Sequence, residues 1–207
     1  MWRKLIGVMA FGVSSLAASQ ARADSLDLNL NDDSMRMTYE AAMGKGGAMD
    51  VGYYYNDRRE GSDADLMHLG LHVTGDNWSQ SGIFNIKVGG RLVYSNPERY
   101  DINLYKHQYE TMALGLGGEV RFSPVHRLGF GASAYYAPRI ASFLDAERYS
   151  EYGVKIDYQL LTQAFIYVGY RQINVEVEHV KDPLAVDHFN GKFELDDSAH
   201  VGLKLLF

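Results

Sequence analysis

The sequence contains no cysteine in its 207 residues. This absence excludes disulfide scaffolds, structural zinc sites with cysteine ligands and thiol nucleophiles. A basic stripe is also missing. The chain is acidic overall, with 20 Lys and Arg against 26 Asp and Glu and a formal net charge of −6. An acidic chain of this kind argues against nucleic-acid binding, so we expect no nucleic-acid partner.

Long apolar runs are missing beyond the first residues. Residues 1–23 have the layout of a secretory signal peptide: two early basic residues, an uncharged and mostly apolar stretch over residues 5–18, and small residues at Ala21 and Ala23. The apolar stretch is shorter than the about 20 residues that a spanning helix needs. We therefore predict cleavage after Ala23, which leaves one domain over residues 24–207 with a net charge of −9, since the signal carries three of the basic residues and no acidic one.

The remaining chain alternates apolar and polar residues with a period of two, which is the pattern of half-buried strands. Its last segment, residues 199–207, places Val201, Leu203, Leu205 and Phe207 on one face. Such a strand is suited to close a barrel against the first strand, which leaves no free edge in lipid. A terminal Phe after this alternation also resembles the C-terminal signature of bacterial outer-membrane barrels. We expect these four residues to act in assembly and to be recognised by the barrel-assembly machinery.

Ten segments alternate in this way and are separated by turn or loop compositions. They cover residues 24–31, 35–41, 49–56, 67–74, 84–94, 112–122, 128–136, 151–160, 166–177 and 199–207. The pattern predicts an all-β fold, a transmembrane antiparallel up-and-down β-barrel of ten strands, or of eight if the first two segments do not span. The longest predicted loops are Ser95–Gln108 and His179–Ser198. The alternation slips before Ile173, where a bulge or an extension above the membrane would account for it.

Aromatic residues stand near the ends of the predicted strands. Interfacial girdles of a membrane barrel belong at such positions. They are Tyr55, Tyr94, Phe122, Tyr136, Tyr152, Tyr158 and Phe207.

The polar face of the strands, which carries the charged residues and glycines, distinguishes a membrane barrel from a soluble β-sandwich or a lipocalin-like barrel. In the soluble folds this face would be solvated surface, because the apolar face would point inward. In a membrane barrel it lines the lumen, where charges need partners. The signal peptide and the terminal Phe favour the lumen, and we predict that its charges form a network that plugs the barrel. The predicted network consists of Asp50, Lys87, Arg91, Glu119, Arg121, Glu151, Lys155, Asp157, Arg171 and Lys204.

Histidine and acidic residues give no metal or catalytic pattern. His68 and His72 share a strand face but lie about 13 Å apart at the rise of a strand, so they cannot bind one metal together unaided. Ser123 and His126 stand in a predicted short turn, with no spacing that identifies a triad. We expect no metal, no cofactor and no catalytic residue. A further acidic group near the long loop is expected to be solvated; it comprises Glu176, Glu178, Asp182, Asp196 and Asp197.

Several motifs resemble the YfaZ family of outer-membrane proteins. They are Ser25-Leu26-Asp27-Leu28-Asn29-Leu30, Tyr135-Tyr136-Ala137-Pro138 with Ser142-Phe143, Tyr152-Gly153, Tyr167-Val168-Gly169-Tyr170-Arg171 and His200-Val201-Gly202-Leu203. The resemblance implies an integral outer-membrane β-barrel of a Gram-negative bacterium. It carries over no site residue.

Two function classes follow from this reading. The first is a structural or surface-interaction barrel with a charge-plugged lumen, a monomer that contacts outer-membrane lipid and lipopolysaccharide. The alternative is a narrow passive pore, porin-like, for small solutes or ions. A lipid A-modifying outer-membrane enzyme is the weakest hypothesis, and we expect that the protein is not an enzyme.

Overall fold

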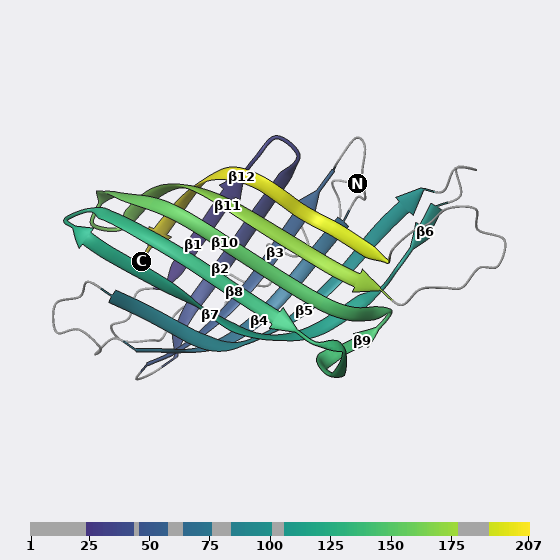
Figure 1. The fold of residues 1–207 in the computed structure, drawn as a ribbon. Helices are drawn as coiled ribbons and strands as arrows, with labels where there is room; N and C mark the ends of the chain where they lie inside the picture. Colours follow the sequence, from purple (N-terminus) through teal and green to yellow (C-terminus); the bar gives the residue numbers. More distant parts are fainter. Residues whose placement is uncertain (1–23, 44–45, 58–63, 76–83, 101–105, 178–190) are drawn as a thin grey trace.

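The computed structural model describes residues 24–43, 46–57, 64–75, 84–100, 106–177 and 191–207. Its twelve strands form one antiparallel sheet, and ten of them close into a barrel (Figure 1). The ten are β1 Ser25–Leu30, β2 Ser34–Met43, β3 Gly47–Asn56, β4 Ala64–Thr74, β5 Phe84–Tyr100, β7 Thr111–Val125, β8 Leu128–Ala137, β10 Ala146–Leu161, β11 Ala164–Val177 and β12 Lys192–Leu206. Among the described residues, no helix is long and apolar enough to cross a membrane.

Pairing of the first strand with the last closes the ring. Leu28 of β1 lies opposite Leu203 of β12, and the Phe207 N–H donates to the Asp24 carbonyl at 2.9 Å. The predicted ten-stranded barrel is therefore confirmed. The eight-stranded alternative is wrong, because both β1 and β2 belong to the ring. With an even number of strands, β1 begins and β12 ends at the same end of the barrel, which we call the terminal end; the opposite end is the loop end.

Two short strands extend the rim at the loop end. β6, Lys106–Gln108, pairs with the last residues of β5, and β9, Ser142–Leu144, pairs with the first residues of β7. A 3-10 turn, Arg139–Ala141, precedes β9. Figure 1 shows β6 and the end of β5 projecting beyond the other strands.

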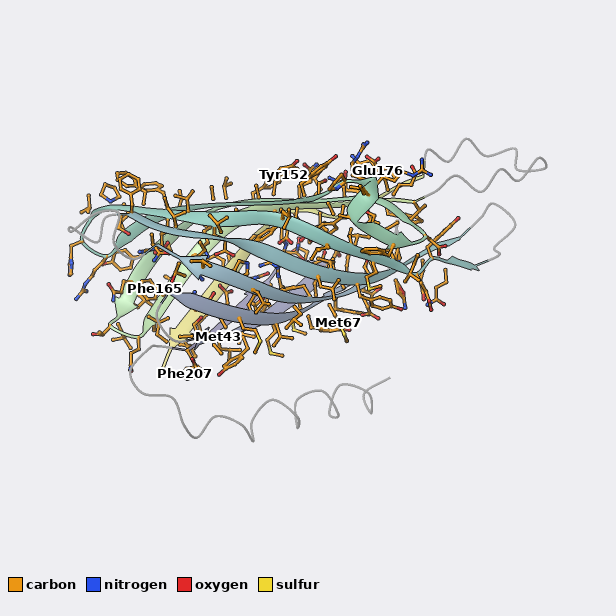
Figure 2. The ribbon with its side chains drawn as sticks, turned by 90° about the horizontal axis from the view of Figure 1, so that it is seen from below. Met43, Met67, Tyr152, Phe165, Glu176 and Phe207 are labelled. Carbon is orange, nitrogen blue, oxygen red and sulfur yellow. The ribbon has the colours of Figure 1, made fainter. Side chains whose placement is uncertain are left out.

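The outer face of the barrel carries an apolar belt. Leu116 is 67% exposed and Val73 is 69% exposed, although both lie within strands. Figure 2 shows side chains covering the outside, with Met67 and Tyr152 on opposite sides of the barrel. Water would disfavour so much exposed apolar surface, whereas lipid accommodates it. Aromatic rings border the belt, with Tyr94, Tyr136, Tyr152 and Tyr170 toward the loop end and Phe84, Phe122, Tyr158 and Phe207 toward the terminal end.

The described part of each long predicted loop includes strand residues. β5 continues through Ser95 to Tyr100, and the Ser95 hydroxyl lies 2.6 Å from the Thr111 hydroxyl of β7. β12 begins at Lys192, well before the predicted start at residue 199. These strands extend past the apolar belt, so their outer face becomes polar, and the sequence pattern used to recognise spanning strands no longer applies. Residues 101–105 and 178–190 lie outside the described residues.

The predicted slip before Ile173 corresponds to the extension of β11 past the apolar belt, and not to a bulge in β11 itself. Arg171, Ile173 and Val175 all point into the lumen, and Ile173 lies opposite Glu151 of β10. The register shift lies in β12, where Asp196 pairs with Ile173 and Glu194 with Asn174, which leaves Leu195 without a partner. The apparent slip arises because the inner face changes from polar to apolar toward the loop end.

The lumen at the loop end is filled by an apolar cluster. Its side chains come from eight strands and are almost fully buried. The apolar cluster consists of Tyr54, Ala64, Leu66, Val93, Ala113, Tyr135, Ala137, Tyr149, Ile173, Val175, Val177, Phe193 and Leu195. The sequence predicted charges in the lumen but did not predict this cluster.

The assignment of the two faces predicts that arginine lowers the stability of the barrel strongly at one position of β10 and hardly at all at the next. Val154 is 57% exposed on the belt, between Tyr152 and Tyr158, whereas Lys155 faces the lumen. Val154→Arg should lower the free energy of unfolding by about 2–4 kcal/mol, the cost of a cation on the lipid face near the midplane. Lys155→Arg, the control, should change it little. Urea unfolding in lipid vesicles measures both, and equal effects would contradict the assignment.

Candidate functional site

Glu151 of β10 is the centre of a layer of buried charge below the apolar cluster. Its carboxylate accepts hydrogen bonds from Arg36 Nη1 at 2.6 Å, from Arg91 Nη1 at 3.1 Å and from Tyr149 Oη at 2.7 Å. Glu151 is 3% exposed. Arg36 comes from β2 and Arg91 from β5, so this one carboxylate ties three strands together across the lumen.

Asp50 of β3 forms a second centre in the same layer. Its two oxygens lie 2.9 Å from His68 Nε2 and 2.8 Å from His72 Nδ1, and Arg91 Nη2 lies 3.6 Å away. His72 Nε2 in turn contacts Tyr135 Oη at 2.9 Å. The two histidines thus lie against the same carboxylate, within ion-pair distance of its two oxygens.

Arg171 of β11 forms the third centre, at the border of the apolar cluster. It donates to Asp196 at 2.6 Å and to Asn29 at 2.9 Å, and its guanidinium lies 5.0 Å from the Tyr54 ring centroid. Asp196 was predicted to be a solvated loop residue; this is wrong, since it lies in β12 and is 1% exposed.

The register shift in β12 creates an acceptor inside the lumen. The carbonyl of Leu195 accepts hydrogen bonds from Tyr54 Oη at 2.9 Å and from Asn56 Nδ2 at 2.6 Å. A bulged residue leaves the hydrogen-bond ladder, and here its carbonyl binds β3 across the barrel. This contact ties β12 to β3 within the apolar cluster.

A cavity of about 470 Å³ lies below the charge layer and extends to the terminal end, where Ser25 and Leu206 line it. We call this cavity the vestibule. Lys87 of β5 forms an ion pair with Glu40 of β2 along its wall. Arg121 of β7 binds Asp157 of β10 in a bidentate pair, at 2.9 and 2.5 Å.

The ten charges predicted from the sequence divide between the layer and the vestibule. All except Asp50 line the vestibule, and Arg91 and Glu151 belong to both. The expected single network is only partly present. Among the described residues, no carboxylate oxygen lies within 4.0 Å of the Lys155 or Lys204 ammonium.

Several residues of the site were missed by sequence reasoning. Arg36 and Glu40 alternate with Met35 and Met37, so their parity already placed them on the lumen face. Asp196 has the same even-numbered parity as His200 and Lys204, but the predicted strand began only at residue 199, so Asp196 was assigned to a loop. The roles of Tyr135 and Tyr149 had no sequence signal, since tyrosine is equally common on the lipid face.

Glycines make room for the charged side chains. A Cβ atom added at Gly52 would overlap the ring of His68, and one at Gly70 would overlap the Asp50 carboxylate. At Gly131 it would lie 3.0 Å from Lys155 Cγ. Glycine at these positions lets large lumen side chains lie flat against the neighbouring strand.

The enzyme hypothesis finds little support in this geometry. Ser123 lies within β7 and His126 in the turn before β8, and the Ser123 hydroxyl has no hydrogen-bond partner among the described residues. Asp50, His72 and Tyr135 form a carboxylate–imidazole–hydroxyl chain, but all three are at most 5% exposed. A substrate would have no access to this chain. Within the described ranges, no group of three His, Cys, Asp or Glu residues is placed to hold a metal ion.

Comparisons with known proteins identify a family. A family model described as "YfaZ precursor" matches residues 4–207. Among solved structures, a KdgM porin in complex with disordered oligogalacturonate has 10% sequence identity and a TM-score of 0.45, covering 90% of this chain and 99% of its own. The NanC porin has 9% identity and a TM-score of 0.41, with coverages of 89% and 99%. The outer membrane channel DcaP of Acinetobacter baumannii has 12% identity and a TM-score of 0.38, with coverages of 92% and 60%. The search of curated proteins gives no match.

The buried layer predicts that Glu151→Gln is strongly destabilising. The change removes the charge that compensates Arg36 and Arg91, and losing one partner of a buried pair costs about 3–5 kcal/mol. Glu176→Gln is the matched control, because Glu176 pairs with Arg148 on the outside of the barrel (Figure 2). It should leave the free energy of unfolding nearly unchanged. Urea unfolding in micelles compares the two, and a neutral Glu151→Gln would refute the layer.

The glycine arrangement predicts a second difference between matched variants. Gly52→Ala forces a methyl group into the space of the His68 ring, and overpacking of this kind costs about 1–3 kcal/mol. Gly115→Ala, also facing the lumen, should be tolerated, because its nearest neighbours, including Arg91 O and Tyr135 Cβ, would lie 3.7 Å from the new Cβ. Thermal unfolding in the same detergent measures the pair. Equal melting temperatures would show that the lumen has room to spare at Gly52.

Proposed function

The chain belongs to the YfaZ family, and we propose that it is an outer-membrane channel for small polar solutes that is closed in the conformation described above. The vestibule is the observation that carries this proposal. It is a cavity of about 470 Å³ that extends to Ser25 and Leu206 at the terminal end and is lined by charged side chains of both signs. A barrel with a purely structural role gains nothing from this space, because dense packing stabilises an interior.

The apolar cluster is the gate of the proposed channel. It lies between the charge layer and the loop end, and Tyr54, Ile173 and Leu195 in it are 0% exposed. An apolar constriction stops ions by excluding water, and a modest widening is enough to wet it. Three strands supply its central side chains, so a small relative movement of β11 and β12 against β3 would open a path.

A sealed structural or surface-interaction barrel is the second candidate. The Leu195 carbonyl contact favours it, because two buried donors from β3 hold the cluster closed. In this case the loop end would be the functional surface, with outer-membrane lipid and lipopolysaccharide as partners. Assembly by the barrel-assembly machinery through the strand that ends at Phe207, and a monomeric state, are proposals common to both candidates.

The proposal also covers the export signal and the absence of catalytic activity. Residues 1–23, which lie outside the described residues, act as an export signal, and cleavage after Ala23 remains a prediction. A transport function needs no catalytic residue, and burial of the Asp50–His72–Tyr135 chain supports a protein that is not an enzyme.

Planar-bilayer recording tests the channel. The wild-type protein should give rare, small openings, and the double variant Ile173→Ala, Phe193→Ala should give larger and more frequent ones, because it removes side chains from the gate. Ile156→Ala is the matched control, since Ile156 is 47% exposed on the lipid face. It should behave as the wild type does.

Folding of each variant is checked by heat-modifiable migration on gels. If neither the wild type nor a folded gate variant conducts, the channel proposal is wrong and the sealed barrel stands. A large, steady wild-type conductance would instead contradict the closed conformation.

A further inference from the structure

We infer that the vestibule binds the anionic group of a small solute, a carboxylate or a phosphate, between Lys155 of β10 and Lys204 of β12. The inference names the solute class of the channel proposed above, and it rests on that function only for transport, because binding in the vestibule needs no open gate.

Cations outnumber carboxylates among the residues that line the vestibule, although Asp196, which pairs with Arg171, lies outside this lining. Seven lining residues are Lys or Arg, and five are Asp or Glu. Most of the cations are already paired, Lys87 with Glu40 and Arg121 with Asp157, while Arg36 and Arg91 bind Glu151. Lys155 and Lys204 are the two lining cations left without a carboxylate within 4.0 Å among the described residues.

Glu119 does not fill this gap. It interacts with both lysines, but also with Lys87 and Arg91, and Glu40, which interacts with Lys204 as well, is already paired with Lys87. Its Oε1 atom lies 3.8 Å from Arg91 Nη2, and its side chain is 36% exposed. One carboxylate shared by four cations leaves a positive potential in a space with low-dielectric walls, and such a space concentrates anions.

The wall between the two lysines supplies a surface for the rest of the solute. Tyr167 of β11 lies between β10 and β12, and the Lys155 ammonium is 5.1 Å from the centroid of its ring. The Tyr167 hydroxyl is held by Asp27 and by Asn29, which fixes the ring in place. Lys155 passes over Gly131, where a side chain would obstruct it. Two cations beside a fixed aromatic ring form a preorganised site, and a cavity of about 470 Å³ is within the size range of small-molecule sites.

Isothermal titration calorimetry of the full mature chain in detergent micelles tests the inference. The probes are citrate and inorganic phosphate, with tetramethylammonium as a cation control. We expect saturable binding of citrate, phosphate or both, and none of tetramethylammonium. Lys155→Met and Lys204→Met should each weaken that binding by about tenfold, the value of one charge-assisted contact. Lys192→Met, at the loop end and outside the vestibule, is the matched control and should leave the affinity unchanged.

The outcomes separate this inference from the channel proposal. Binding that depends on both lysines, in a protein that never conducts, supports the anion site and refutes the channel. If the protein conducts but binds no anion, or if both substitutions leave the affinity for the anion unchanged, the anion site is refuted and the channel proposal stands. If a methionine variant fails to fold, Lys155→Gln and Lys204→Gln remove the charge while keeping a polar side chain, and the same expectations apply. Saturation by citrate alone assigns a carboxylate, and saturation by phosphate alone assigns a phosphate.

Discussion

Every backbone N–H and C=O group of a chain in lipid must find its partner within the protein, and the rest of this structure depends on that constraint. Pairing of β1 with β12 meets it by leaving no strand edge within the ring. Closure at ten strands also fixes a narrow lumen, into which every second side chain must point. The polar residues that cannot face lipid are therefore brought within reach of one another. Ion pairs such as Arg36 with Glu151 follow from this confinement, because an unpaired buried charge is costly.

Confinement also explains why glycines and charges are interleaved along the strands. A long lumen side chain cannot extend straight across a ten-stranded barrel that is already occupied from the other walls, so it lies along the neighbouring strand. His68 takes the space beside Gly52, and Lys155 takes the space beside Gly131. The glycines of the lumen face are thus part of the packing of the charges, and the two residue types are needed at matched positions on adjacent strands.

The residues that face outward and inward change in character along the length of the strands. Within the lipid belt they are apolar outside and polar inside. Beyond the belt, toward the loop end, the pattern reverses: Arg148 and Glu176 pair on the outer surface, while Val175 and Phe193 pack inside. Water on the outside of the extended rim permits charges there, and the rim's interior must then be stabilised by apolar packing. This reversal divides the lumen into an apolar gate and a charged vestibule, and the proposed function depends on that division.

The sequence by itself determined the fold class, the ten strands and the lumen-facing parity of residues such as Arg91, Glu119 and Lys155, because a period of two survives in any barrel. It also contained the parity that places Arg36 in the lumen. Only the tertiary structure decided which charges meet. Arg36 and Glu151 are 115 residues apart in sequence and contact each other across the barrel, and such a contact depends on register and shear, which alternation does not encode. The single unpaired residue Leu195 changed the parity of β12, which hid Phe193 and Leu195 as residues of the gate. Lys155 and Lys204 look like every other lumen cation in the sequence, and their lack of a partner emerges only when the walls of the barrel are placed around them.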